Sequence, residues 1–299
     1  MTLITASLML AAPLAAQTPP LIETNPITSV TTRQDSAMRM TVPVKIDGRG
    51  PYDFVIDTGA DRTVVSREIA TALQLGPGDP VTMHSMTGVS GIGTVRVDRL
   101  DLAGHVTRDI HAPALEEANL GAHGLLGLDT LKGRRIVMDF AKRRLSVLAA
   151  GEKERDDPDT IVVTARSRYG QLVLVDADVD GTPITVIIDS GAQSTIGNSA
   201  LRRLLAKRNR KLEFFKTVLI DVTGGQLPAE YAAVGRMRIA GLIMANPVIA
   251  FADAHPFARY GLANKPAMLL GMDSLRGFKR VSVDFAQRKV RFLLADVPS

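Results

Sequence analysis

Short stretches of alternating or continuous apolar residues, separated by Gly, Pro, Asp and Asn, run through most of the chain. Residues 94–97 (TVRV) and 237–239 (MRI) alternate apolar and polar positions, which is typical of strands with one buried face. Two β-rich runs, residues 42–46 and 172–179, end in Asp-Gly pairs at residues 47–48 and 180–181, and such pairs predict tight hairpin turns. The pattern therefore predicts a fold made mostly of β-strands.

Few helices are predicted, and each prediction rests on a side chain able to accept hydrogen bonds from first-turn amides. One helix is expected over residues 67–75 and its counterpart begins at residue 200. Two further one-turn helices are expected to end before glycines 133 and 277. The four residues predicted to cap these helices are Ser66, Ser199, Asp129 and Asp273.

The chain repeats one plan twice, and three landmarks recur in the same order. The second half is the longer one, and its extra residues are expected after position 204 and over 253–266, as loop insertions. The landmark pairs are 54–60 (FVIDTGA) with 186–192 (VIIDSGA), 124–133 (GLLGLDTLKG) with 268–277 (MLLGMDSLRG), and 137–143 (VMDFAKR) with 282–288 (SVDFAQR).

The first landmark has the residues that a two-carboxylate site needs. Asp57 and Asp189 each follow a buried strand that would hold the carboxylate in place. The next residue in each copy has a small hydroxyl that can bond across to the partner loop, and the glycine after it lets an amide approach the carboxylate. These supporting residues are Thr58, Gly59, Ser190 and Gly191.

Duplication lets the two loops meet on a pseudo-twofold axis, where two carboxylates would share one proton. One carboxylate would take a proton from water while the other donates to a carbonyl oxygen. A single Asp-Thr-Gly more often closes a strand without any chemistry. Two copies, each followed by an apolar-apolar-Gly segment, favour Asp57 and Asp189 as catalytic residues.

These motifs resemble those of the retropepsin-like and pepsin-like aspartic proteases, in a single-chain form of bacterial periplasmic type. The resemblance covers nearly all of residues 40–294, and residues 57–61 (DTGAD) match the retropepsin form. The second copy departs at Gln193, which puts the ion pair of Asp61 in question on that side. The resemblance implies an all-β, bilobal acid-protease fold in which two retropepsin-like lobes are related by pseudo-twofold symmetry and the substrate cleft lies between them.

The resemblance also implies β-hairpin flaps over the cleft, although ordinary surface hairpins remain an alternative. Residues 82–93 hold no Tyr, so the flaps resemble those of retropepsins more than those of pepsins. His84, near the first flap, receives no role. The flap candidates are Thr87, Gly88 and Gly91 in residues 86–91 (MTGVSG), and Thr223, Gly224 and Gly225 in residues 222–226 (VTGGQ).

Composition narrows the function classes. The absence of Cys removes disulfides, thiolate metal sites and cysteine nucleophiles, and no His pair has metal-ligand spacing. No Gly-x-Ser-x-Gly elbow suggests a serine hydrolase. No metal or cofactor is therefore predicted. Trp is absent and aromatic residues make up 4%, so no nucleic-acid partner is predicted either.

Two groups of side chains leave alternatives open. The basic residues over 202–211 favour a solvated helix face, with contact to acidic groups as the other interpretation. Five methionines favour core packing, with a pocket lining as the alternative. They are Met83, Met86, Met237, Met244 and Met272.

The N-terminus suggests export. Residues 1–16 are apolar but lack a basic residue, and they suit a cleaved signal peptide; an uncleaved anchor and a mis-assigned start are the alternatives. The expected location is periplasmic or secreted, with no stable membrane anchor after cleavage. The expected divisions are a signal peptide (1–16), a flexible segment (17–38), an N-terminal lobe (39–149), a linker (150–168) that includes a joining strand at 161–165, and a C-terminal lobe (169–296).

The sequence therefore predicts an aspartic endopeptidase that processes protein or peptide substrates in the periplasm. Both motifs lie in one chain, so a monomer is expected. A peptide-binding module without turnover is the alternative. Ala60 and Ala192 stand where a hydroxyl would lower the carboxylate pKa values, which predicts an optimum of about pH 5 to 6.

Overall fold

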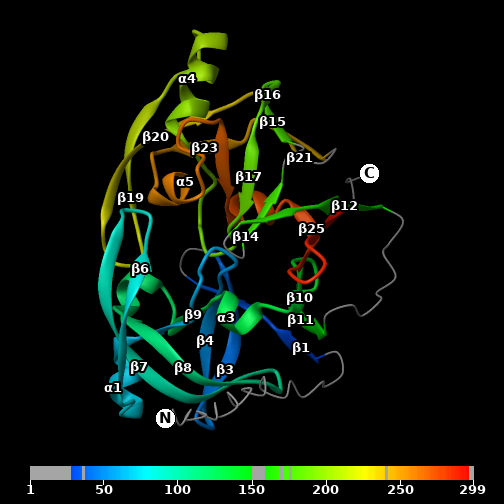
Figure 1. The fold of residues 1–299 in the computed structure, drawn as a ribbon. Coiled ribbons are helices and arrows are strands. Elements are labelled where there is room, and N and C mark those ends of the chain that lie inside the picture. Colours follow the sequence, from blue (N-terminus) through cyan, green and yellow to red (C-terminus); the bar gives the residue numbers. More distant parts are fainter. Residues whose placement is uncertain are drawn as a thin grey trace, which may run out of the picture.

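The chain forms two β-rich lobes, one from each half, which lie one above the other in Figure 1 and are joined by a sheet with strands from both halves. The computed structural model describes residues 28–35, 38–149, 159–168, 171–174, 177–239 and 242–295. The predicted signal peptide and the rest of the segment before residue 28 lie outside these residues. The prediction of an all-β, bilobal fold is confirmed.

An eight-stranded sheet forms most of the N-terminal lobe, and its strand β3 also pairs with β7. In spatial order its strands are β2 (Arg33–Gln34), β3 (Met40–Ile46), β4 (Arg49–Ile56), β9 (Gly124–Leu126), β5 (Val64–Ser66), β8 (His105–Leu115), β7 (Val89–Leu102) and β6 (Pro77–His84).

The C-terminal lobe has an eight-stranded and a four-stranded sheet. The larger one has the order β13 (Arg166–Arg168), β14 (Gln171–Leu174), β17 (Thr185–Ile188), β24 (Ala267–Leu270), β18 (Ile196–Gly197), β23 (Val248–Phe251), β20 (Gln226–Ala233) and β19 (Phe215–Ile220). The smaller one has the order β16 (Thr182–Pro183), β15 (Ala177–Val179), β21 (Arg236–Ile239) and β22 (Leu242–Ala245).

A six-stranded sheet joins the lobes, since both halves of the chain contribute to it. Strands β10 and β25 pair at its centre, with Val137 opposite Ser282. Its order is β1 (Thr28–Thr31), β11 (Arg144–Ala149), β10 (Arg134–Asp139), β25 (Phe278–Asp284), β26 (Lys289–Leu294) and β12 (Thr160–Thr164).

The internal repeat of the sequence is also a repeat of topology. The strand order β4-β9-β5-β8-β7-β6 in one lobe corresponds to β17-β24-β18-β23-β20-β19 in the other. In both lobes the strand before the Asp motif pairs in parallel with the strand of the Leu-Leu-Gly motif. Both Asp-Gly pairs form turns with positive φ at the two residues, as predicted. The hydrophobic core runs through both lobes, because Ile136 of β10 packs in the same cluster as Val283 of β25.

Six short helices occur among the described residues: α1 (Arg67–Leu73), α2 (Glu117–Leu120), α3 (Leu128–Leu131), α4 (Ser199–Arg208), α5 (His255–Arg259) and α6 (Met272–Leu275). Ser66 caps α1 as predicted. Asn198 caps α4, so the prediction for Ser199 is wrong; the Ser199 hydroxyl donates to Asp253 instead. Asp129 and Asp273 do not cap α3 and α6, because both carboxylates accept hydrogen bonds from a threonine behind the Asp loop.

The segments outside the lobes are more ordered than predicted. Residues 28–34 were expected to be flexible but form β1 and β2, since β1 pairs with the outer edge of β11. In the predicted linker, β12 pairs with β26 in the equivalent way, which confirms the joining strand, and β13 follows it. Residues 150–158 lie outside the described residues.

The basic residues over 202–211 and the five methionines mostly follow the favoured interpretations, a solvated face and core packing. Basic residues of α4 and the turn after it are mostly exposed, as expected of a solvated face, while Arg202 pairs with Glu230. Met237 and Met272 are buried, and the other three methionines pack against the apolar clusters. Met272 also lines a surface pocket, described below. Among the described residues, no helix has the length and apolar character needed to cross a membrane.

Candidate active site

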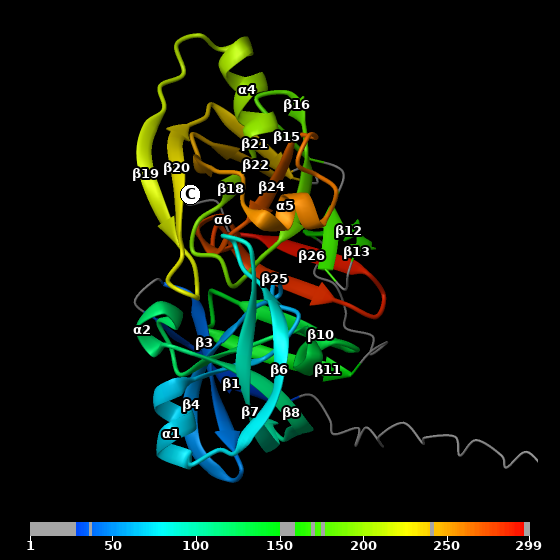
Figure 2. The same ribbon diagram turned by 60° about the vertical axis from the view of Figure 1, so that its left-hand side comes forward.

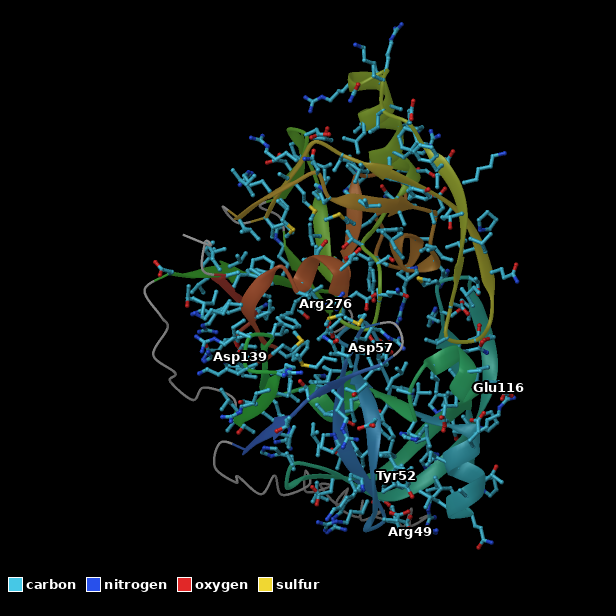
Figure 3. All side chains as sticks on the ribbon, turned by 180° about the vertical axis from the view of Figure 1, so that it is seen from behind. Arg49, Tyr52, Asp57, Glu116, Asp139 and Arg276 are labelled. Atoms are coloured by element: carbon cyan, nitrogen blue, oxygen red, sulfur yellow. The ribbon has the colours of Figure 1, made fainter. Side chains whose placement is uncertain are left out.

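Asp57 lies at the centre of the molecule, between the lobes, while Arg49 and Tyr52 mark the outer part of the strand that leads to it (Figure 3). The Asp57 amide donates to the Leu126 carbonyl at 3.0 Å. In the other lobe the Asp189 amide donates to the Leu270 carbonyl at 3.1 Å. Each Leu-Leu-Gly strand therefore fixes the backbone at which an aspartate begins its loop.

The two Asp loops hold each other by hydrogen bonds across the lobe interface. The Thr58 amide donates to the Ser190 hydroxyl at 3.1 Å, and the Ser190 amide donates to the Thr58 hydroxyl at 3.0 Å. The Thr58 hydroxyl donates to the Ile188 carbonyl at 3.0 Å, and that of Ser190 donates to the Ile56 carbonyl at 2.8 Å. Both side chains are almost fully buried, so these bonds lock the lobes together.

Each aspartate lies against the glycine of the opposite loop. A Cβ atom placed on Gly59 would collide with the Asp189 carboxylate, and one on Gly191 would collide with that of Asp57. Glycine is therefore required at both positions. The carboxylates also accept bonds from their own loops, from the Gly59 amide to Asp57 at 2.8 Å and from the Gly191 amide to Asp189 at 3.1 Å.

Burial raises the pKa values of both carboxyls above their ordinary range. For Asp189, burial and the adjacent charge of Asp57 raise the pKa to about 7, against the lowering effect of amide donors. The pair therefore retains a shared proton at pH values where isolated carboxyls have lost theirs.

Arg39 is a buried cation beside this pair that the sequence analysis did not assign. It forms an ion pair with Asp35 at 2.6 Å, and it donates to the Gly191 carbonyl of the second Asp loop at 3.1 Å and to the Leu120 carbonyl. Its charge lowers the pKa values of Asp57 and Asp189 and so offsets part of the effect of burial. Nothing in the sequence pattern around Arg39 distinguished it from a surface arginine.

Threonine–aspartate pairs support the Asp loops from behind. The Asp129 carboxylate accepts hydrogen bonds from the Thr63 amide at 2.9 Å and from its hydroxyl at 2.7 Å. Asp273 receives the same two bonds from Thr195, at 2.9 and 2.6 Å. The conformation of each loop is thus fixed both behind it and across the axis.

Asp61 of the first motif has Gln193, which carries no charge, as its equivalent in the second motif, and its own ion-pair partner comes from outside both motifs. The carboxylate of Asp61 accepts a hydrogen bond from Arg259 of α5, in the opposite lobe, at 2.7 Å. An interlobe ion pair therefore exists on this side. On the other side, the backbone carbonyl of Gln193 accepts the Asp273 amide at 3.1 Å.

Both predicted flaps are β-hairpins whose ends approach the opposite lobe (Figure 2). Strands β6 and β7 form the first, and β19 and β20 form the second. Thr87 and Gly88 lie in the first turn, and residues 223–225 lie in the second, as predicted. Gly91 lies within β7, opposite Thr82, on the strand of the first flap that leads away from the turn.

The tips of the flaps touch each other and the opposite lobe. The Asp221 carboxylate accepts hydrogen bonds from the amide and hydroxyl of Thr87, at 3.1 and 2.6 Å. His84 stacks on His255 of α5, with their ring nitrogens 2.9 Å apart, and the His255 amide donates to the Met86 carbonyl. His84 and Asp221 thus have contacts that the sequence analysis missed, because their partners are far away in the chain.

A pocket of about 490 Å³ lies apart from the flaps, where β2, the β10–β11 turn and α6 meet. Neither Asp57 nor Asp189 lines it. In the described ranges, no group of three or more His, Asp or Glu side chains is arranged to hold a metal ion. The residues that line the pocket are Thr32, Arg33, Gln34, Met38, Met40, Phe140, Arg143, Met272 and Arg276.

Comparisons with protein families agree with this division into two lobes. A family model described as a gag-polyprotein putative aspartyl protease matches residues 42–133, and a second, described as an aspartyl protease, matches residues 175–274. No curated protein matches the chain. Each matched region contains one of the two Asp motifs. The chain therefore belongs to the retropepsin-like aspartic protease family, with two protease domains in tandem.

Proposed function

We propose that the protein is an aspartic endopeptidase in which Asp57 and Asp189 together activate a water molecule. The observation that carries this proposal is the pair of buried carboxyls, each with a raised pKa and each held against the glycine of the opposite loop. Groups with strongly perturbed pKa values in such a setting are typical of catalytic sites.

The reaction needs one proton on the pair. The ionised carboxylate accepts a proton from water as its oxygen attacks the peptide carbonyl carbon, while the protonated carboxyl donates to the carbonyl oxygen. The carboxyl that took the proton from water then donates it to the leaving nitrogen, the other carboxylate takes a proton back from a hydroxyl of the tetrahedral intermediate, and the C–N bond breaks. The products are a carboxylic acid and an amine, and the pair again holds a single proton.

Two further features belong to this proposal. Both carboxylates come from one chain, which supports a monomer as the active unit. The apolar residues 1–16 support export, with protein substrates in the periplasm or outside the cell. The runner-up is a module that binds peptides without cleaving them, and the intact hydroxyl and glycine residues in both loops favour the enzyme.

The test is to incubate the purified protein with a mixture of peptides and to identify the products by mass spectrometry. We expect cleavage at internal peptide bonds by the wild type. Asp57→Asn and Asp189→Asn should each lower kcat/KM by about 10⁴-fold or more, and the double variant should be no worse than either single, because the two residues act as a unit. Peptide binding by the wild type without any cleavage would instead establish the runner-up.

A further inference from the structure

The two flap tips occupy equivalent positions in the repeat but differ in one informative residue. Residues 85–88 (SMTG) follow strand β6, and residues 221–224 (DVTG) follow strand β19. Both tips share the Thr-Gly pair and an apolar second residue. At the first position, Ser85 stands in one tip and Asp221 in the other.

Asp221 is the hydrogen-bonding centre of both tips. Within its own hairpin it accepts bonds from the Thr223 amide at 2.9 Å, the Thr223 hydroxyl at 2.6 Å and the Gly225 amide at 3.0 Å. From the other flap it accepts the amide and hydroxyl of Thr87. The carboxylate is buried although it lies at the end of a hairpin.

The ionisation of Asp221 follows from these contacts. Burial alone would raise the pKa of this carboxyl, but hydrogen bonds from Thr223, Thr87 and Ser85 outweigh burial and lower the pKa to about 2. The carboxylate therefore stays charged above about pH 4, and its bonds to hydroxyls and amides are charge-assisted.

The apolar residue of each tip packs on the opposite lobe, next to this contact. Met86 of the first flap packs against a cluster in the C-terminal lobe that includes Phe257 and Tyr260. Val222 of the second packs against one in the N-terminal lobe that includes Leu120. Movement of either flap away from the opposite lobe would therefore separate Thr87 from Asp221.

The asymmetry of the tips makes the contact favourable. If the two flap tips had the same sequence, the position of Ser85 and the equivalent position of Asp221 would hold either two carboxylates or two serines, close to each other. Two carboxylates would repel each other, and two serines would lack a charged acceptor. Because both tips belong to one chain, one can supply the carboxylate and the other the donors.

We propose that Asp221 is a positioning residue which, through Thr87, latches the two flaps together, so that peptide can enter or leave only when this contact breaks. The substrate part of the proposal rests on the proposed protease function. The contact itself does not, because it joins two residues of this chain, Thr87 and Asp221.

A double-mutant cycle tests the latch. Hydrogen exchange of the tip amides, including the Thr87 amide that donates to Asp221, is compared in the wild type, Asp221→Asn, Thr87→Val and the double variant. We expect exchange to be about tenfold to a hundredfold faster in Asp221→Asn, the scale of a lost charged hydrogen bond. Thr87→Val should add little in the Asp221→Asn background, because the two residues share the interaction.

Two variants control for effects on the turn alone. Thr223→Val removes a bond within the second hairpin, so it should leave exchange of residues 85–88 within about threefold of the wild type. Ser85→Asp places a second carboxylate near Asp221, so it should speed exchange in both tips. Unchanged exchange at residues 85–88 in Asp221→Asn, or additive effects in the cycle, would overturn the latch.

The same variants link the latch to turnover. Because the same contact would also hold the flaps closed over bound peptide, weakening it favours the open form from which peptide leaves. We therefore expect kcat/KM for a cleaved peptide to fall about tenfold in Asp221→Asn, mainly through KM. An inactive wild type that still shows the exchange pattern would refute the protease function and leave the latch in place. If Asp221→Asn shows the expected faster exchange of the tip amides but an unchanged KM, the role of the latch in substrate entry would be refuted.

Discussion

Thr58 and Ser190 exchange hydrogen bonds across the lobe interface, since the amide of each donates to the hydroxyl of the other. The Thr58 hydroxyl also donates to the Ile188 carbonyl. Because both residues are almost fully buried, water cannot replace a lost partner. This exchange fixes the separation of Asp57 and Asp189, which precede the two residues.

Removing the Thr58 hydroxyl should destabilise the protein. Thr58→Ala leaves the Ser190 amide and the Ile188 carbonyl without that partner, at about 1–3 kcal/mol for each buried group left unpaired. Thr58→Ser keeps the hydroxyl and serves as the matched control, with a smaller loss. Urea unfolding measures both variants, and equal losses in the two would contradict the role of the hydroxyl.

The raised pKa of Asp189 predicts an upper pH limit for activity. The pair needs one proton, so kcat/KM should fall as the pH rises past about 7, where Asp189 loses its proton. Protonation of the second carboxyl should lower activity on the acid side, which puts the optimum at about pH 5 to 6. A pH–rate profile with an optimum below about pH 4 would contradict this expectation.

Ala192, which follows Gly191 in the second Asp loop, should influence the upper pH limit of activity. The Ala192 amide already donates to Asp189 at 3.1 Å, and Ala192→Thr adds a hydroxyl that can favour the ionised carboxylate. A lower pKa then moves the basic limb of the profile toward acid. Ala192→Val has the same shape without the donor, so its profile should stay close to that of the wild type.

Arg39 should influence both stability and the pH profile. Arg39→Met removes a cation that lowers the pKa values of both aspartates, so those pKa values should rise and the basic limb should move to higher pH. It also leaves the buried Asp35 carboxylate unpaired, which should cost about 3–5 kcal/mol of unfolding free energy.

Two controls separate these effects of Arg39. Arg39→Lys keeps the charge and should keep the basic limb in place. Adding Asp35→Asn to Arg39→Met removes the unpaired carboxylate and should restore part of the stability without restoring the profile. A basic limb that does not move in Arg39→Met would show that its charge does not act on the pair.

The histidine pair at the first flap should make flap closure depend on pH. In the closed protein, burial and the charges of Arg259 and His255 lower the pKa of His84, against the opposite effect of Asp61. Closed flaps therefore bind fewer protons than open ones, and acidification through about pH 6.5, the ordinary pKa of histidine, should favour opening. Hydrogen exchange at residues 85–88, corrected for its intrinsic pH dependence, should be faster at pH 5.5 than at pH 7.5 (about tenfold at most).

His84→Gln keeps a polar side chain but cannot become charged. Its corrected exchange should therefore be nearly independent of pH in this range. His111 offers a control, since it contacts Asp79 away from the flap tip. The same pH dependence in His84→Gln as in the wild type would rule out this histidine as its source.

The sequence by itself determined the repeat, the two Asp motifs and the predominance of strands. These features are local, because an Asp-Gly turn or an alternating strand is encoded by adjacent residues. The duplication then implied that Asp57 and Asp189 meet, since equivalent loops of equivalent lobes lie together on a pseudo-twofold axis. The segment 28–34 was misjudged as flexible because a two- or four-residue strand has too few positions to show a period.

Tertiary structure alone decided which distant side chains meet. Three contacts of the site join residues far apart in the chain, so no local pattern identifies them. They are those of Arg39 with the second Asp loop, Asp61 with Arg259, and Asp221 with Thr87. Whether a carboxylate caps a helix, as predicted for Asp129, or supports a loop depends on which donor lies closer once the chain is packed. The pKa values of the pair were likewise decided by burial and neighbouring charges, which exist only in the folded protein.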